Sequence, residues 1–185
     1  MSYLYTWSFI REKSPKFEIY LEELIRARKV FNLSGAREME DFIKLIEESL
    51  APLLVIEDWR DKYVIDIGSG AGFPGIPLAI MKEEAKFLLL DSSSKRTTFL
   101  NLVKVRLKLD NVDILCGDAR RLSANPDYIE RFDIALSRGL GREDFVRELA
   151  IPFLKKGGKF LIFKNEGPGY FIRPGLVILE EIKDV

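Results

Sequence analysis

A glycine-rich stretch between two apolar segments constrains the fold more than any other feature of the chain. It covers residues 63–80 and contains four glycines, at 68, 70, 72 and 75. The apolar run before them has the length of a buried strand, and the apolar residues after them begin a helix. A strand, a tight glycine turn and a helix in this order form the place where an α/β sheet binds a nucleotide-like ligand. The glycines let the backbone approach such a ligand closely.

The same pattern of strand, loop and helix repeats along the rest of the chain. We expect strands at 63–67, 86–90, 112–116, 132–136 and 159–164, and helices at 76–82, 95–109 and 143–153. Gly157 and Gly158 lie in an expected turn over residues 155–158. Alternating strands and helices predict parallel pairing with right-handed crossovers. The predicted fold is therefore α/β and Rossmann-like, with a mostly parallel sheet flanked by helices.

The two ends of the chain depart from this pattern. Residues 1–57 are predicted to be helical, with helices at 17–30 and 37–54, a turn at 32–35 and a break at Pro52. We expect them to form an N-terminal helical extension packed on the core, rather than a lid or an RNA-contacting arm. Residues 58–185 form the second unit. Its C-terminal end is abbreviated, because only one more strand at 176–182, pairing with 170–172, fits after Lys164.

Composition excludes several classes of site. The chain has no histidine and one cysteine, which excludes a Ser-His-Asp triad, His-ligated metals and a disulfide framework. Lys plus Arg and Asp plus Glu are both 29, so net charge predicts no polyanionic partner. No apolar stretch reaches the roughly 18 residues of a membrane span. We expect a cytoplasmic monomer without a metal and without a membrane contact.

The glycine turn fits two ligand classes. Residues 70–75 match G-x-G-x-x-G, and Asp91 lies about 20 residues further on, as in dinucleotide-binding proteins. Two features oppose a dinucleotide. Asp66 precedes the glycines, where it would repel a pyrophosphate, and Pro74 and Pro77 remove N–H donors from the start of the helix. S-adenosylmethionine carries positive charge and no phosphate, so the sequence favours S-adenosylmethionine.

On this interpretation each strand end has a role. Asp91 would accept hydrogen bonds from the ribose hydroxyls, or cap the following helix. Asp118 would accept from the adenine amino group, or be a solvated turn residue, while Ala119 and Arg120 offer backbone contacts. The remaining predicted cofactor contacts are Asp66, Gly68, Ser69, Gly70, Gly72, Phe73 and Arg138.

The methyl acceptor is constrained by what the sequence lacks. No Asn/Asp-Pro-Pro-aromatic segment of the amino-group methyltransferases follows the fourth strand, and Cys116 is predicted to be a small buried residue rather than a nucleophile. A ring nitrogen such as guanine N7 has a free lone pair and needs no general base, so alignment supplies most of the catalysis. Basic residues directly after strand ends, Lys95, Arg96 and Arg138, indicate a polyanionic substrate.

Together these segments resemble the glucose-inhibited division protein B family, the bacterial 16S rRNA guanine-N7 methyltransferases. The resemblance covers about residues 20–164 and rests on the segments 66–78, 90–100, 137–138 and 32–34. It implies methyl transfer from S-adenosylmethionine to a guanine N7 in the decoding-region loop of the small ribosomal subunit. It also implies cofactor contacts at Gly68, Phe73, Ala119, Arg120 and Arg138, and basic catalytic-site residues at Lys95, Arg96 and Arg138.

The chain departs from the family pattern at three places. Leu45 and Glu48 stand where the family has histidine and aspartate, Asp118 replaces a usual arginine, and the C-terminal end is shorter. Three other functions stay open at this point. The first is an S-adenosylmethionine-dependent methyltransferase with another acceptor, and the second is an NAD-binding oxidoreductase. The third is an RNA-binding protein without catalytic activity, which the shortened end and the missing histidine would suit.

Overall fold

Three helices and a short 3-10 turn precede the sheet. The computed structural model describes residues 5–31, 38–163 and 176–181. Helix α1 spans Trp7–Lys13, α2 Lys16–Phe31 and α3 Met39–Ser49, and a 3-10 turn follows at Ala51–Leu54. The predicted helix over 17–30 is confirmed, whereas the predicted helix over 37–54 ends at Ser49 and continues as the 3-10 turn around Pro52. The predicted turn at 32–35 lies outside the described residues.

The described strands form one sheet in the order β3-β2-β1-β4-β5-β6. Strands β1 to β5 pair in parallel and β6 pairs antiparallel to β5, which confirms the mostly parallel α/β prediction. In chain order the elements are β1 Tyr63–Ile67, α4 Gly75–Met81, β2 Lys86–Asp91, α5 Ser94–Leu107, β3 Val112–Cys116, α6 Ala119–Leu122, β4 Phe132–Arg138, α7 Glu143–Ala150, a 3-10 turn Ile151–Phe153, β5 Leu154–Phe163 and β6 Leu176–Glu181.

Three predicted boundaries around β4 and β5 are wrong. Strand β4 continues through Ser137 and Arg138, because Ser137 pairs with both Ile67 and Ile162. Strand β5 already begins at Leu154, so the segment predicted as a turn at 155–158 is a β-bulge inside the strand, where the register shifts and Gly157 has a φ of 74°. Helix α7 ends at Ala150 and continues as a 3-10 turn. The short helix α6 was not predicted.

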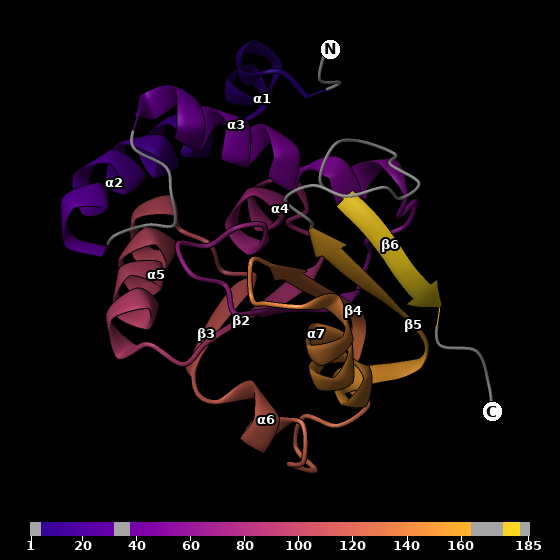
Figure 1. Ribbon diagram of the computed structural model, residues 1–185. Helices are drawn as coiled ribbons and strands as arrows, with labels where there is room; N and C mark the ends of the chain where they lie inside the picture. Colours follow the sequence, from indigo (N-terminus) through magenta and orange to yellow (C-terminus); the bar gives the residue numbers. More distant parts are fainter. Residues whose placement is uncertain (1–4, 32–37, 164–175, 182–185) are drawn as a thin grey trace.

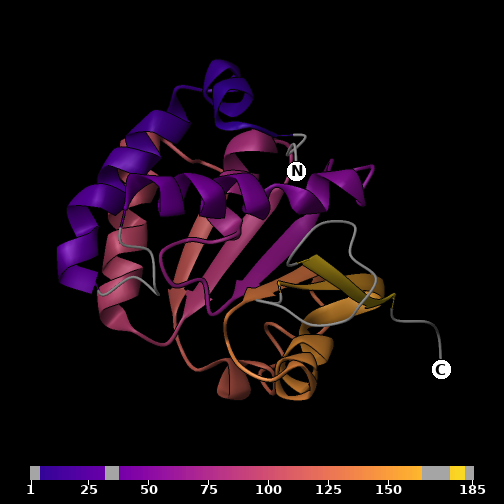
Figure 2. The same ribbon diagram turned by 45° about the horizontal axis from the view of Figure 1, so that its top comes forward.

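Helices cover both faces of the sheet (Figure 1). Helices α1 to α5 lie on one face and α7 on the other, and Figure 2 shows α3 running across the top of the sheet beside α2. Each face has its own apolar cluster. Along β1, Val64 packs in the cluster of the α1–α5 face, while Ile65 and Ile67 pack in the cluster beneath α7. Because side chains alternate along a strand, Asp66 faces α4 on the same side as Val64.

Strand β6 forms the edge of the sheet next to β5. Its register places Phe160 opposite Leu179. The expected strand over 176–182 is therefore present over 176–181. The expected partner segment at 170–172 lies outside the described residues. No helix among the described residues is long and apolar enough to cross a membrane.

Candidate functional site

The loop between β1 and α4 turns sharply at the carboxyl ends of two adjacent strands. The N–H groups of Gly68 and Ser69 both donate to the Leu90 carbonyl at the end of β2, at 2.8 and 3.0 Å. Gly68 has a φ of 74°, and a side chain there would come within 2.6 Å of Leu140. Only glycine fits this position without strain. The loop is thus tied to β2 and packed under the segment that follows β4.

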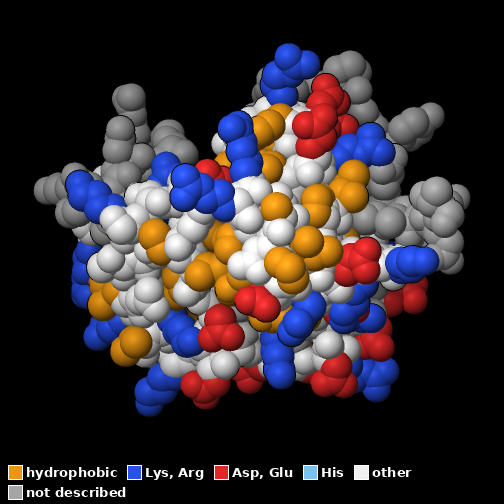
Figure 3. Space-filling view, turned by 90° about the horizontal axis from the view of Figure 1, so that it is seen from below, with side chains coloured by type: hydrophobic (Ala, Val, Ile, Leu, Met, Phe, Trp, Pro, Cys, Tyr) orange, Lys and Arg blue, Asp and Glu red, His pale blue; other side chains and the backbone are white. Residues whose placement is uncertain are grey.

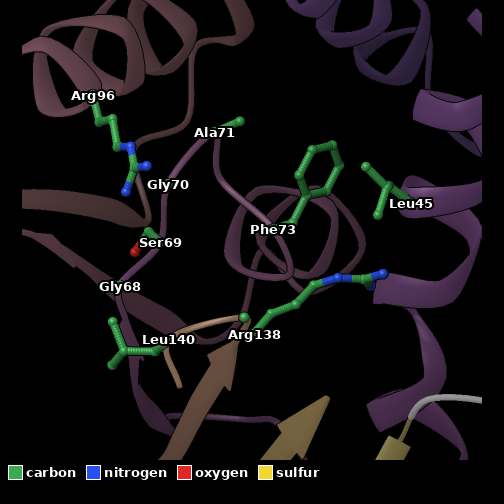
Figure 4. Close-up of a pocket in the computed structure, with 10 residues that line it drawn as sticks. Leu45, Gly68, Ser69, Gly70, Ala71, Phe73, Arg96, Arg138 and Leu140 are labelled. Carbon is green, nitrogen blue, oxygen red and sulfur yellow. The ribbon is translucent and has the colours of Figure 1, made fainter. Parts of the chain in front are cut away.

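A first cavity of about 200 Å³ lies beside this loop. Figure 4 shows that its lining comes from α3, the glycine loop, α5 and the end of β4. Leu45 and Phe73 face each other on one side, and the stem of Arg138 runs from β4 toward α3. The complete lining is Leu45, Gly68, Ser69, Gly70, Ala71, Phe73, Arg96, Arg138, Gly139 and Leu140.

A second cavity of about 240 Å³ adjoins the first, and both are lined by Gly68, Arg96 and Leu140. It lies between the ends of β1, β2 and β3 and the helices α6 and α7. Its lining is Ile67, Gly68, Leu90, Asp91, Ser92, Arg96, Gly117, Asp118, Ala119, Arg120, Leu140, Phe145 and Leu149. Figure 3 views the molecule from the side of α6 and α7, with apolar side chains gathered near the middle and charged side chains around them.

Asp91 lines the second cavity and is bonded to the glycine loop. Only 2% of its surface is exposed, and its Oδ2 accepts from the Gly70 N–H at 2.9 Å. The Ser93 N–H donates to Oδ1 at 2.9 Å, and Arg96 donates to Oδ2 at 3.4 Å from a side chain that is 47% exposed. A carboxylate offers about four lone-pair sites, so a hydroxyl group can still bind, and it can also replace the long contact of Arg96. Asp91 therefore both anchors the loop and fits the predicted ribose role.

Asp118, Ala119 and Arg120, which the sequence analysis proposed as cofactor contacts, all line the second cavity. Asp118 is exposed and caps α6 by accepting from the Arg120 N–H at 2.9 Å. The guanidinium of Arg120 lies 4.9 Å from the centre of the Phe145 ring. The Phe145 ring gives the cavity an apolar wall, and Asp118 adds a carboxylate to that of Asp91. The capping role of Asp118 leaves its adenine role as a prediction.

Asp66 lies beneath the loop and not in either cavity. It is fully buried, and its Oδ2 accepts from the Gly75 N–H at 3.0 Å. Among the described residues its Oδ1 has no hydrogen-bond partner. Burial, with a smaller contribution from the Asp91 charge, raises the pKa of Asp66 to about 8, although the Gly75 hydrogen bond opposes the shift. The sequence placed Asp66 in front of the ligand, whereas strand alternation directs it toward α4.

Gly72 also lines neither cavity. Its φ is 102°, and a side chain there would come within 2.6 Å of Ile76 and 3.0 Å of the Tyr20 hydroxyl. That hydroxyl is buried and donates to the Ala71 carbonyl at 2.8 Å. Burial, and then the nearby charge of Asp66, raise the pKa of Tyr20 well above its usual value. Gly72 thus allows α2 to pack directly against the loop.

The structure separates the three basic residues that the sequence grouped. Arg138 and Arg96 both line the first cavity, but Lys95 is exposed and lines neither cavity. The Nη2 of Arg138 donates to Glu48 Oε2 of α3 at 2.6 Å, and both side chains are about one-sixth exposed, at 15% and 16%. In the sequence, Glu48 and Leu45 stand out only as departures from the family pattern. Their position on one helical face could have suggested that they act together.

The prediction for Cys116 is wrong. Its side chain is exposed, with Sγ 3.9 Å from the Ser92 carbonyl. Strand β3 lies at one edge of the sheet that the described strands form. Among the described residues, no group of three or more acidic or cysteine side chains could hold a metal ion.

Comparison with known proteins assigns the chain to one family. Residues 13–169 match the family described as rRNA small subunit methyltransferase G, GidB. The chain is 41% identical over 155 residues to the ribosomal RNA small subunit methyltransferase G of Oenococcus oeni, covering 83% of this chain and 64% of that protein. Its identity to the Fusobacterium nucleatum protein of the same name is 43% over 161 residues, covering 86% of this chain and 68% of that protein.

A solved structure supports the fold alone. The SAM-dependent methyltransferase from Thiobacillus denitrificans, in complex with S-adenosyl-L-homocysteine, superposes with a TM-score of 0.51 at 24% identity. The match covers 63% of this chain and 48% of that one. The Rossmann-like methyltransferase fold is therefore shared. The chain also spans about two thirds of the length of the relatives it matches, 64% for the first of them.

Proposed function

Because the chain belongs to the rRNA small subunit methyltransferase G family, we propose that it transfers a methyl group from S-adenosylmethionine to N7 of a guanine in 16S ribosomal RNA. The target would lie in the decoding-region loop of the small subunit. One observation carries the proposal: the two cavities meet over Gly68, so one elongated ligand can lie across both.

The second cavity suits the adenosine half of the cofactor. Asp91 would accept from the ribose, and Asp118, Ala119 and the Arg120–Phe145 pair would surround the base. The first cavity suits the methionine half, which would lie along Gly68, Ser69 and Gly70 beside Arg138. When bound, S-adenosylmethionine supplies an electrophilic methyl group on a positively charged sulfur. The protein then contributes orientation and exclusion of water.

The start of α4 argues against a dinucleotide. Pro74 has no N–H at the N-cap position, and the Gly75 N–H donates to the buried Asp66. A phosphate at this helix start would therefore lose donors on which phosphate binding relies. S-adenosylmethionine has no phosphate, so it loses nothing. An NAD-binding oxidoreductase remains the weaker alternative.

The described lining of the first cavity contains no side chain that could act as a general base. Arg96 and Arg138 are the ionisable side chains among its described lining residues, and arginine stays protonated in proteins. The acceptor atom must therefore carry a free lone pair and no proton to remove. A purine ring nitrogen meets this requirement, and Leu45 and Phe73 provide an apolar surface for a flat base. This favours guanine N7 over an exocyclic amino group.

Basic side chains surround the site. Lys95, Arg96, Arg120 and Arg121 are exposed near the carboxyl edge of the sheet, and they suit contact with RNA phosphates. The partner would be the small ribosomal subunit in the cytoplasm, with the protein acting as a monomer. Residues 1–57 would form a helical extension on the methyltransferase domain at 58–185.

A methyl-transfer assay tests the proposal. The chain is incubated with tritiated S-adenosylmethionine and small subunits from a strain lacking the modification, and the labelled nucleotide is then mapped. We expect a single N7-methylguanine in 16S rRNA. Label at another atom or in another RNA would favour a different acceptor. Thermal stabilisation by NAD, but not by S-adenosylhomocysteine, would favour the oxidoreductase.

A further inference from the structure

An ion pair connects helix α3 to the end of β4. Glu48 lies in the last turn of α3, and Arg138 is the last residue of β4, 90 positions later. Their contact of 2.6 Å is between side chains that are mostly buried, so water screens it less than a surface pair. The other oxygen of Glu48 is 4.0 Å from the exposed Lys44. The short contact to Arg138 is therefore the main interaction of this carboxylate.

The pair fixes one end of the Arg138 side chain, and the strand fixes the other. The neighbouring Ser137 hydroxyl donates to the Ile67 carbonyl at 3.0 Å, which holds the end of β4 against β1. The Phe163 ring lies under the guanidinium at 5.4 Å. Figure 4 shows the stem of Arg138 passing beneath Phe73 toward α3. The stem consequently forms part of the cavity wall, and its position depends on where the guanidinium is held.

One donor of this guanidinium is left over. Nη1 of Arg138 is buried and has no hydrogen-bond partner among the described residues. Leaving a buried donor unpaired is unfavourable, and most buried donors in proteins have a partner, so this one requires an explanation. The same side chain lines the first cavity. Arg138 is thus held by Glu48 through Nη2, while Nη1 is available to donate to a ligand bound in the cavity.

We propose that Glu48 is a positioning residue that holds Arg138 in place for the ligand in the first cavity. The inference rests on the proposed function, since Arg138 matters only if that cavity binds cofactor or acceptor. Glu48 touches neither ligand itself, and it acts by orienting the guanidinium and balancing its charge. Losing a hydrogen bond between charged groups typically costs about 10- to 100-fold in an equilibrium constant.

The neighbouring Glu47 provides a matched control. Its Oε1 accepts from the Trp7 N–H at 2.6 Å, so it ties α3 to α1, and it does not line either cavity. Glu47→Gln and Glu48→Gln both remove one carboxylate from the same turn. A scaffold role predicts a lower melting temperature for either variant. A positioning role predicts that only Glu48→Gln changes ligand binding or transfer in the folded protein.

The experiment is a double-mutant cycle between Glu48 and Arg138. The full chain is prepared as wild type, Glu48→Gln, Arg138→Met, the double variant and Glu47→Gln. For each, calorimetry gives the dissociation constant for S-adenosylhomocysteine, single-turnover assays on unmodified small subunits give the transfer rate, and thermal unfolding checks the fold. We expect Glu48→Gln to weaken whichever step Arg138→Met weakens, by about 10- to 100-fold, and to change nothing further in the Arg138→Met background.

Three results would overturn the proposal. They are wild-type binding and transfer in Glu48→Gln, a full Glu48→Gln effect persisting in the Arg138→Met background, and an equal effect of Glu47→Gln. If Glu48→Gln does not fold, Glu48→Asp takes its place, because it keeps the charge and shortens the reach. A wild-type chain that binds no S-adenosylhomocysteine and transfers no methyl group would instead refute the proposed function, and this proposal with it.

Discussion

The two walls of the first cavity are built by different means. The glycine loop is held by backbone hydrogen bonds from Gly68 and Ser69 to the adjacent strand, and by the Asp91 carboxylate. Arg138 is instead held by a side chain from another layer of the molecule, Glu48, 90 residues away. A wall made of backbone contacts has little freedom to move. A wall made of one long side chain depends on its partner. We therefore expect the glycine loop to hold the cofactor in one position, and we expect the position of Arg138 to change when its partner Glu48 is substituted.

A large loss of stability should come from a substitution that breaks the packing between the glycine loop and α2. Gly72→Ala combines a left-handed φ of 102° with contacts of 2.6 Å to Ile76 and 3.0 Å to Tyr20. We expect a loss of about 2–4 kcal/mol in the free energy of unfolding, measured by urea denaturation. Gly139→Ala is the control. Gly139 also has a positive φ, of 65°, but no atom lies within 4 Å of a Cβ added there. Equal losses for both would show that packing at Gly72 is unimportant.

Asp91 and Asp118 sharpen the comparison between a buried and an exposed carboxylate of the site. Asp91→Asn removes the charge of the carboxylate, whose oxygens accept hydrogen bonds from Gly70, Ser93 and Arg96. We expect affinity for S-adenosylhomocysteine to fall by about 10- to 100-fold, which is roughly 1.4–2.8 kcal/mol. Asp118→Asn keeps a good helix cap and should change affinity by less than about threefold. Calorimetry measures both, and the reverse order would contradict the assignment of the ribose role.

The raised pKa of Asp66 predicts how the free energy of unfolding depends on pH. Its pKa in the folded chain is about 8, against an ordinary value of 3.8. Between these two values the folded state binds the proton and the unfolded state does not, so this group stabilises the fold at low pH and loses that contribution as pH rises. The slope is at most about 1.4 kcal/mol per pH unit.

The Asp66→Asn variant isolates this contribution. Its amide cannot ionise, so the wild-type chain should lose stability relative to the variant as pH rises from about 4 to about 8. Chemical denaturation at several pH values gives the difference. A difference that stays constant over this range would mean that Asp66 titrates normally.

The smallest effect tests the link between α2 and the loop wall. Tyr20→Phe removes the hydroxyl that donates to the Ala71 carbonyl at 2.8 Å, and leaves the ring packed 5.7 Å from that of Phe73. We expect a loss of about 1 kcal/mol in the free energy of unfolding. Tyr63→Phe is a comparable tyrosine change away from the loop. No loss in Tyr20→Phe would mean that α2 supports the loop by packing alone.

The wall of the first cavity that the glycine loop forms could be predicted from the sequence, because the residues that determine it are close together in the chain. The strand, the glycines and Asp91 lie within 30 residues, and each pattern has one structural solution. Even the error at Asp66 was avoidable, since the period of two along β1 puts it on the face of Val64. Arg138 stands out in the sequence because it lies at the end of a strand, and the structure makes it the last residue of β4.

The wall of the first cavity that Arg138 forms could be predicted only in part. The contact of Arg138 with Glu48 depends on how α3 crosses the sheet, and no local pattern in the sequence encodes that crossing. The exposure of Cys116 likewise depends on strand order, which places β3 at the edge. The bulge in β5 was mistaken for a turn because Gly157 and Gly158 are typical of both.

The most direct test of the account is a crystal structure of the chain with S-adenosylhomocysteine. We predict one molecule lying across Gly68, with its ribose at Asp91, its adenine beside Asp118 and Phe145, and its amino-acid end beside Arg138. In that structure Glu48 should still contact Arg138. A ligand confined to one cavity, or held away from Gly68, would contradict the claim that both cavities form one site.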